Sequence, residues 1–469
     1  MSETVPAASA SFWAIVREAL AGSRRDLTRE ALGRAILLLA VPMVLEMIME
    51  SIFAIADIFW VSKLGPDAVT VVAMTETFMT IVYTTAMGLA MGTGAVVARR
   101  TGAKDTAGAA VGAVQAIILG VSISAVLGLA GALLGPRLLA VMGASPAVVA
   151  LGATFPRVMI GGSATILLLF VINAAFRGAG DASITMRTLW LANAINIALG
   201  PCFIFGIGPF PRLGVTGAAV ATTIGRGVGV LYQLRALAAA RGRLRVTRAE
   251  WRVSGETART ILRLSRSGAV QMFVGMASWI VLMKLVSPFG SSVIAGYGIA
   301  FRVVMFALLP AWGLGNAAAT LVGQNLGAKQ PERGEQAVWR AAFYNFVFLG
   351  CVGVVLAVFA PQVIRLFTPV PEVVEAGGRC LRIVACGFFF YAYGMVVTQA
   401  FNGAGDTKTP MRINLVCFWV WEIPAAYVLS RPAGLGPTGI FIAIAAAFSL
   451  VAVLGVALFR RGRWKSVQV

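Results

Sequence analysis

Long runs of apolar residues alternate with short polar segments along the whole chain. Each run has about 20 residues or more and few charges, which is enough for a helix to cross roughly 30 Å of hydrocarbon. Only helices or closed barrels satisfy backbone polar groups in lipid, and runs this long and continuous predict helices. The predicted spans lie at approximately 35–61, 68–98, 108–135, 149–175, 184–207, 213–239, 258–287, 291–322, 340–366, 376–401, 410–430 and 436–459.

The chain repeats itself at half its length. The residues AFRGAGD at 175–181 return as AFNGAGD at 400–406, which is 225 positions later. The same offset relates Gly102-Ala103-Lys104 to Gly327-Ala328-Lys329 without a gap. A period this long indicates two copies of a half-protein rather than a solenoid, and six predicted spans fall in each copy.

Composition agrees with a protein embedded in lipid. The chain of 469 residues is 59% hydrophobic and 12% charged, with a mean hydropathy of +0.85. These values exclude an ordinary water-soluble domain. We therefore predict an all-α polytopic membrane protein with twelve transmembrane helices in two six-helix bundles.

The net charge of +20 indicates orientation rather than nucleic-acid binding. Most of the 39 basic residues lie in alternate loops, which predicts that these loops and both termini are cytoplasmic. The opposite loops carry little beyond Lys63, Arg137, Arg212 and Arg431. We expect a multi-pass protein of the bacterial cytoplasmic (inner) membrane that contacts lipid, binds no nucleic acid and is a monomer.

An even number of helices per copy places both copies in the membrane the same way round. The copies are then related by a pseudo-twofold axis along the membrane normal. The predicted organisation is a cytoplasmic tail at 1–34, an N-terminal bundle at 35–239, a linker at 240–257, a C-terminal bundle at 258–459 and a tail at 460–469. The apolar and basic residues of the first tail fit a surface helix or a disordered segment equally well.

Several kinds of chemistry are excluded by the residues present. The chain has no histidine, which removes His-ligated metals and His-activated nucleophiles. The five cysteines show no CxxC spacing and there is no Walker motif, so we expect neither a bound cofactor, a metal centre nor ATP as the energy source. The chain is therefore predicted not to be an enzyme.

Acidic residues inside the first span are the main candidate site. At 100° per residue, Glu50 lies about 40° and Asp57 about 20° around the helix from Glu46, so all three form one stripe about 16 Å long. Acids at membrane depth usually face a water-filled cavity or an ion pathway. The alternative for each of the three acids is a structural role, which for Glu46 would be capping of a neighbouring helix or pairing with a buried arginine such as Arg157 or Arg226. Glu76 and Glu422 likewise have two interpretations, a functional role or an ion pair.

The two copies differ at this stripe. The positions equivalent to Glu46, Glu50 and Asp57 are Gln271, Gly275 and Leu282. An acidic stripe in only one copy of a symmetric scaffold predicts that a coupling cation binds in the N-terminal bundle.

An ordered set of motifs then resembles the multidrug and toxic compound extrusion (MATE) family over nearly the whole chain. The motifs are Pro42, Ala56-Asp57, Lys63-Leu64-Gly65, GLAMGTGAVVARRTGAKD at 88–105, FRGAGD and FNGAGD in the two copies, VGQNLGAK at 322–329, Asn196-Ile197 with Pro201, IFG at 204–206 and LGVTGAAVAT at 213–222.

The resemblance implies a V-shaped pair of bundles that exports organic, often cationic compounds by alternating access, driven by inward protons or sodium ions. Asp57 matches the family's coupling aspartate, Asn196 its partner on the fifth span, and Thr222 or Thr223 its hydroxyl on the sixth. The family's aspartate on the fifth span is replaced here by Gly200. We expect Glu46, Glu50 or Glu76 to replace it, and a sodium ion, where one is used, to bind at Asp57 and Asn196.

Soft and aromatic side chains near the acidic stripe are candidates for the substrate cavity, because adaptable side chains suit varied apolar ligands. A lipid-linked saccharide flippase is the first alternative, although its cavity should be basic to meet pyrophosphate. An intramembrane lipid-modifying enzyme is the second. The cavity candidates are Met43, Met47, Phe53, Met276, Gln271 and Glu422.

Overall fold

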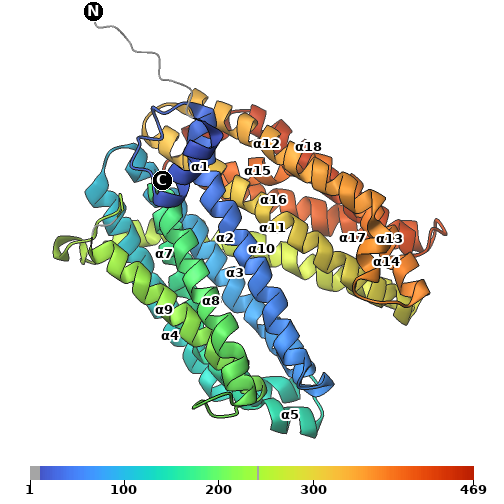
Figure 1. Cartoon of the computed structure of the whole chain (residues 1–469). Coiled ribbons are helices and arrows are strands. Elements are labelled where there is room, and N and C mark those ends of the chain that lie inside the picture. The colour runs from blue at the N-terminus through green and yellow to red at the C-terminus, as the bar shows by residue number, and fades with distance from the viewer. Residues whose placement is uncertain (1–10, 240–241) are drawn as a thin grey trace, which may run out of the picture.

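The computed structural model describes residues 11–239 and 242–469, and this part of the chain is helical with no strands. Residues 1–10 of the predicted tail and residues 240–241 of the predicted linker lie outside it. Figure 1 shows two helical bundles that meet near α1 and the C-terminus and splay apart toward the opposite end. We refer to the end that carries α1 and the C-terminus as the terminal face.

The first bundle, the N-lobe, follows a short surface helix, α1 Phe12–Ala21. The N-lobe helices are long because their sequences are apolar over many turns. Pro42 lies inside α2 and Pro201 inside α8. The N-lobe helices are α2 Leu32–Ser62, α3 Pro66–Gly102, α4 Thr106–Val141, α5 Pro146–Gly152, α6 Thr154–Gly161, α7 Ser163–Ala179, α8 Ala182–Phe205 and α9 Val215–Ala238.

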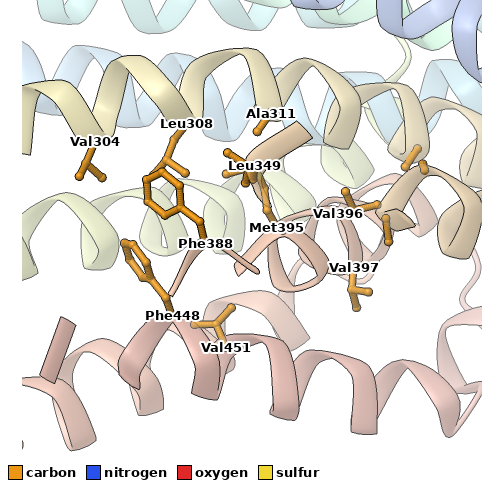
Figure 2. Close-up of a cluster of buried hydrophobic side chains, with 14 of the residues drawn as sticks. Val304, Leu308, Ala311, Leu349, Phe388, Met395, Val396, Val397, Phe448 and Val451 are labelled. Carbon is orange, nitrogen blue, oxygen red and sulfur yellow. The ribbon is translucent and has the colours of Figure 1, made fainter. Parts of the chain in front are cut away.

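The second bundle, the C-lobe, repeats this arrangement after the turn η1 Arg248–Glu250. Its core includes Leu308 of α11, Leu349 of α12, Phe388 of α15 and Phe448 of α18 (Figure 2). The C-lobe elements are α10 Gly255–Val286, η2 Ser287–Phe289, α11 Ser291–Gly327, α12 Pro331–Val358, α13 Ala360–Arg365, α14 Pro371–Cys386, α15 Phe388–Ala404, α16 Lys408–Asn414, the π-helical turn η3 Leu415–Glu422, α17 Ile423–Ser430, α18 Pro437–Arg460 and η4 Arg463–Ser466.

Within the described residues, ten helical segments are long and apolar enough to cross a membrane, and α14 with α15 forms an eleventh span bent by 57°. The remaining predicted span is α9, which carries Arg226 near its middle. Two further spans predicted as continuous are interrupted, besides the bent span at 376–401: 149–175 covers α5, α6 and α7, and 340–366 covers α12 and α13. The predicted boundaries between lobes, linker and tails stay predictions.

Close glycine contacts across the lobe interface follow the sequence repeat. Gly88 of α3 leaves no room for a Cβ against Ala269 of α10, and its equivalent Gly313 of α11 is equally tight against Met43 and Val44 of α2. Val44 and Ala269 are themselves 225 positions apart. The two lobes therefore pack through α2, α3, α10 and α11 with pseudo-twofold symmetry.

The lobes are in tightest contact at the terminal face. Gly102 of α3 lies against the backbone of Gln324, and its equivalent Gly327 of α11 lies against the backbone of Arg99. Nη2 of Arg99 also donates to the backbone oxygens of Ala404, at 3.2 Å, and Val467, at 2.5 Å. These contacts close the terminal face, while the other end of the molecule is splayed (Figure 1).

Candidate functional site in the N-lobe

The three acids of the predicted stripe on α2 have three different environments. Glu46 is buried, lies 3.5 Å from Nη1 of Arg177 on α7, and accepts a hydrogen bond of 2.9 Å from Thr185 of α8. Glu46 therefore pairs with a buried arginine, as the structural alternative expected, but the partner is Arg177 rather than Arg157 or Arg226. The end of α7 and the start of α8 bring Arg177 and Thr185 to this depth of α2.

Glu50 is half-buried one turn further along α2. Its Oε2 accepts a hydrogen bond of 3.0 Å from Nδ2 of Asn193 on α8. Asn193 lies three residues before Asn196, so the two amides share one face of α8. Sequence analysis did not single out Asn193, although this helical spacing was the available signal.

Asp57 is half-buried and makes no hydrogen bond or ion pair within the described residues. One turn beyond Asn193 on α8, Nδ2 of Asn196 donates to Oγ1 of Thr222 on α9 at 2.7 Å, and both side chains are buried. Thr222, rather than Thr223, is thus the hydroxyl paired with Asn196. The Asp57 carboxylate therefore has no hydrogen-bond or ion-pair partner in the part of the chain that the structure describes.

Arg226 is the functional candidate that sequence analysis considered only as a partner for Glu46. It follows Thr222 by one turn of α9 and is 6% exposed. Its Nη2 donates to Oη of Tyr83 on α3 at 3.2 Å, and its Cζ lies 5.9 Å from the ring centre of Phe53. Its Nη1 is buried and has no hydrogen-bond partner among the residues that the structure describes.

A single guanidinium therefore lies among several acids without a close ion pair to any of them. Arg226 is within electrostatic reach of Glu50, Asp57 and Glu76, and Glu76 is the exposed acid of the group. No set of three acidic or cysteine side chains in the described residues is placed to hold a metal ion. Together with Tyr83, Asn193, Asn196 and Thr222, we term these residues the N-lobe polar cluster.

The predicted cavity residues divide by burial. Met43 is fully buried at the interface with Gly313, while Met47 and Phe53 are partly exposed and Met276 is exposed. In the C-lobe, Gln271 and Glu422 are both 1% exposed, and each has one side-chain oxygen without a partner in the described chain. In this conformation Met43, Gln271 and Glu422 lie inside the protein rather than at an open surface.

Comparison with known proteins identifies the family to which the chain belongs. The MatE family model matches residues 42–202 and again residues 268–428. The chain belongs to the MatE family. The two matches also correspond to the two copies of the repeat. Members of this family are transporters, so this MatE protein is a multi-pass membrane transporter and not an enzyme.

Individual MatE relatives are similar over almost the whole length. The chain is 26% identical over 450 residues to the probable multidrug resistance protein YoeA of Bacillus subtilis, covering 94% of this chain and 96% of YoeA. It is 26% identical over 410 residues to the FAD transporter of Shewanella oneidensis, covering 86% and 89%.

A solved structure supports the two-lobe fold. It is described as the outward-facing conformation of a multidrug resistance MATE family transporter of the MOP superfamily, and it matches with a TM-score of 0.87 and 28% identity. The match covers 93% of this chain and 97% of that one. The predicted all-α, two-bundle membrane fold is thus confirmed.

Proposed function

We propose that this MatE protein is a secondary active exporter of organic, cationic or amphipathic compounds, driven by protons or sodium ions that move inward. The observation that carries the proposal is the carboxylate of Asp57, which has no partner among the described residues and lies in the N-lobe polar cluster. The positions equivalent to Glu50, Asp57 and Glu76 in the second copy are Gly275, Leu282 and Phe301, so they carry no acid. Desolvation favours the neutral form of a carboxylate, so a group in this setting can take up and release a cation during the cycle. No bound cofactor is required.

The arrangement of the lobes supports alternating access. Arginine and lysine are concentrated toward the terminal face, which we assign to the cytoplasm of a bacterial cell, with the protein a monomer in the inner membrane. The closed terminal face and splayed opposite end then represent an outward-open state. A cation must bind the two conformations differently to drive export.

Glu50 is the candidate that best replaces the acid absent at Gly200. It bonds to Asn193 on the face of α8 that carries Asn196, whereas Glu46 is already paired with Arg177. Gly200 leaves open space toward α2, where a Cβ would meet only Trp60 at 3.7 Å. We propose that Asp57 and Glu50 bind the cation, with Asn196, Thr222 and Glu76 as further polar groups.

The substrate would contact the exposed side of this cluster. Met47, Phe53 and Met276 offer soft or aromatic surface there, and Glu76 adds a negative charge suited to a cation. Met43, Gln271 and Glu422 would join the cavity only if helix packing changes during the cycle.

A second candidate is transport of an anionic compound, including flipping of a lipid-linked saccharide. The buried Nη1 of Arg226 supports it, because an unpartnered guanidinium can accept a carboxylate or phosphate oxygen. The relative from Shewanella oneidensis carries the name FAD transporter, and FAD bears a pyrophosphate. The acids around Arg226 balance its charge, and we therefore rank cation export first.

Transport by purified protein in vesicles tests the proposal. Efflux of a fluorescent cationic dye is measured under a pH gradient and then under a sodium gradient, with an anionic dye of similar size as the comparison. Cation efflux under one gradient supports the proposal and identifies the ion. Transport of only the anionic dye would replace it with the second candidate.

A further inference from the structure

Two recesses at the terminal face occupy equivalent places in the two lobes. The N-lobe recess, of about 210 Å³, includes Asp181 and Arg187 of the α7–α8 region. The C-lobe recess, of about 280 Å³, includes Asp406 and Arg412, which are the same positions 225 residues later. The two recesses differ in the protein groups that contact their arginines.

The N-lobe recess is covered by the protein itself. Nη2 of Arg187 donates to the backbone oxygens of Leu20, at 2.7 Å, and Ala21, at 3.0 Å. These are the last carbonyls of α1, where the helix dipole places negative partial charge. Arg187 therefore has oxygen partners supplied by the chain.

The described part of the chain places no such cover over the C-lobe recess. The segment that follows the first copy is held on the N-lobe, since the Arg243 amide donates to Asp181 at 2.5 Å and Gln115 of α4 donates to the backbone oxygen of Arg252 at 2.6 Å. No described segment supplies carbonyl oxygens to Arg412 as α1 does to Arg187.

Three arginines line the C-lobe recess without partners in the described chain. Arg412 comes from α16, and Arg461 and Arg463 follow the end of α18. The one acid in the recess, Asp406, already accepts hydrogen bonds from the backbone nitrogen of Thr409, at 3.2 Å, and from its hydroxyl, at 2.6 Å. The recess thus presents three guanidinium groups that form no ion pair in the described chain, opposed by the single carboxylate of Asp406.

The remaining wall of the recess is largely apolar and comes from membrane-spanning elements. Val416 of η3 and Leu454 and Leu458 of α18 line the recess. Further along the same two elements, Val420 is 65% exposed and Val453 is 58% exposed. An apolar chain bound here would continue along this surface toward the middle of the bundle.

We propose that the C-lobe recess binds an anionic phospholipid. Its phosphate oxygens take the place that the α1 carbonyls occupy in the N-lobe and bond to Arg412, Arg461 and Arg463, while an acyl chain lies against Leu454 and Leu458. Arginine suits phosphate through paired hydrogen bonds, and basic recesses beside membrane helices favour anionic headgroups. Lipid binding at this recess does not depend on which compound the protein transports.

Native mass spectrometry of the full-length protein in detergent tests this site. The probes are phosphatidylglycerol and phosphatidylcholine with identical acyl chains, and inorganic phosphate. The variant combines Arg412→Gln, Arg461→Gln and Arg463→Gln. The matched control removes the same charge from three exposed arginines of α10 outside the recess, through Arg259→Gln, Arg263→Gln and Arg266→Gln.

We expect wild-type protein to retain phosphatidylglycerol over phosphatidylcholine, and the recess variant to bind phosphatidylglycerol at least about tenfold more weakly than the control variant. Leu454→Trp, which fills the apolar wall and leaves the charges, should also weaken lipid binding. Equal losses in the two triple variants, equal retention of the two lipids, or inorganic phosphate competing at the strength of the lipid would overturn the proposal.

Discussion

Nη1 of Arg177 lies 3.5 Å from Oε1 of Glu46 in the interior of the N-lobe, and Thr185 completes the pairing. Of the three acids on α2, Glu46 therefore has a structural partner, while Asp57 has none within the described residues. This difference separates an acid that holds helices together from one that is free for transport.

Replacing Glu46 with Leu should destabilise the protein by about 3 kcal/mol, because it leaves the Arg177 guanidinium nearly buried and unpaired. Adding Arg177→Met should recover most of the loss, since an apolar pair of similar volume can replace a buried ion pair. Unfolding of the purified variants in detergent measures both effects. Additive losses in the double variant would show that the two side chains do not act as a pair.

Asp57→Asn should abolish ion-coupled transport and change stability by less than about 1 kcal/mol, because no hydrogen bond or ion pair is lost. Coupled uptake of protons or sodium ions and efflux of substrate are measured in vesicles. Asp67→Asn, at the start of α3, is the matched control and should transport normally. Undiminished coupling in the Asp57 variant would remove this residue from the proposed mechanism.

Gly102→Ala should weaken closure of the terminal face, because a Cβ at this position overlaps the backbone of Gln324 across the lobe interface. Spin labels at Ala103 and Gln330, in protein without native cysteines, should report a longer or broader distance distribution. Gly298→Ala on α11 adds the same methyl group where nothing lies within 4 Å. The same distribution in both variants would contradict the assignment of this contact as the closing point.

The Asp26–Lys104 ion pair should add stability that depends on pH. Burial disfavours ionisation of Asp26, but hydrogen bonds from Lys104 and Thr28 outweigh it and lower the pKa of Asp26 from 3.8 to about 2. Because the pKa of Asp26 is lower in the folded than in the unfolded protein, ionised Asp26 stabilises the fold at pH values above its unfolded-state pKa. This contribution is lost as the pH falls from about 4 toward 2.

Because Asp26 is about one-third exposed, solvent screening reduces this contribution to about 1 kcal/mol. Wild type should therefore have a higher Tm than Asp26→Asn at pH 7, and the difference should shrink below pH 4. Asp105→Asn is the control for loss of a nearby carboxylate, because Asp105 directly follows Lys104 and caps the start of α4. A Tm difference that persists unchanged to pH 2.5 would exclude the ion pair as its source.

Helical spacing in the sequence points to three further residues of the site. Asn193 lies one turn before Asn196, Arg226 lies one turn after Thr222, and Tyr83 lies two turns after Glu76. Each missed residue shares a helix face with a residue that was predicted. Periodicity shows such a face, but it does not show which other helix packs against it.

The sequence by itself determined the scaffold: apolar run length predicted the membrane helices, and the 225-residue repeat predicted two lobes related by symmetry. It also located the asymmetry, since Gln271, Gly275 and Leu282 cannot supply acids to the second lobe. Only the tertiary structure decided which charges meet. Ion pairing depends on helix contacts distant in sequence, and these bring Arg177 to Glu46, leave Asp57 free and leave the C-lobe arginines uncovered.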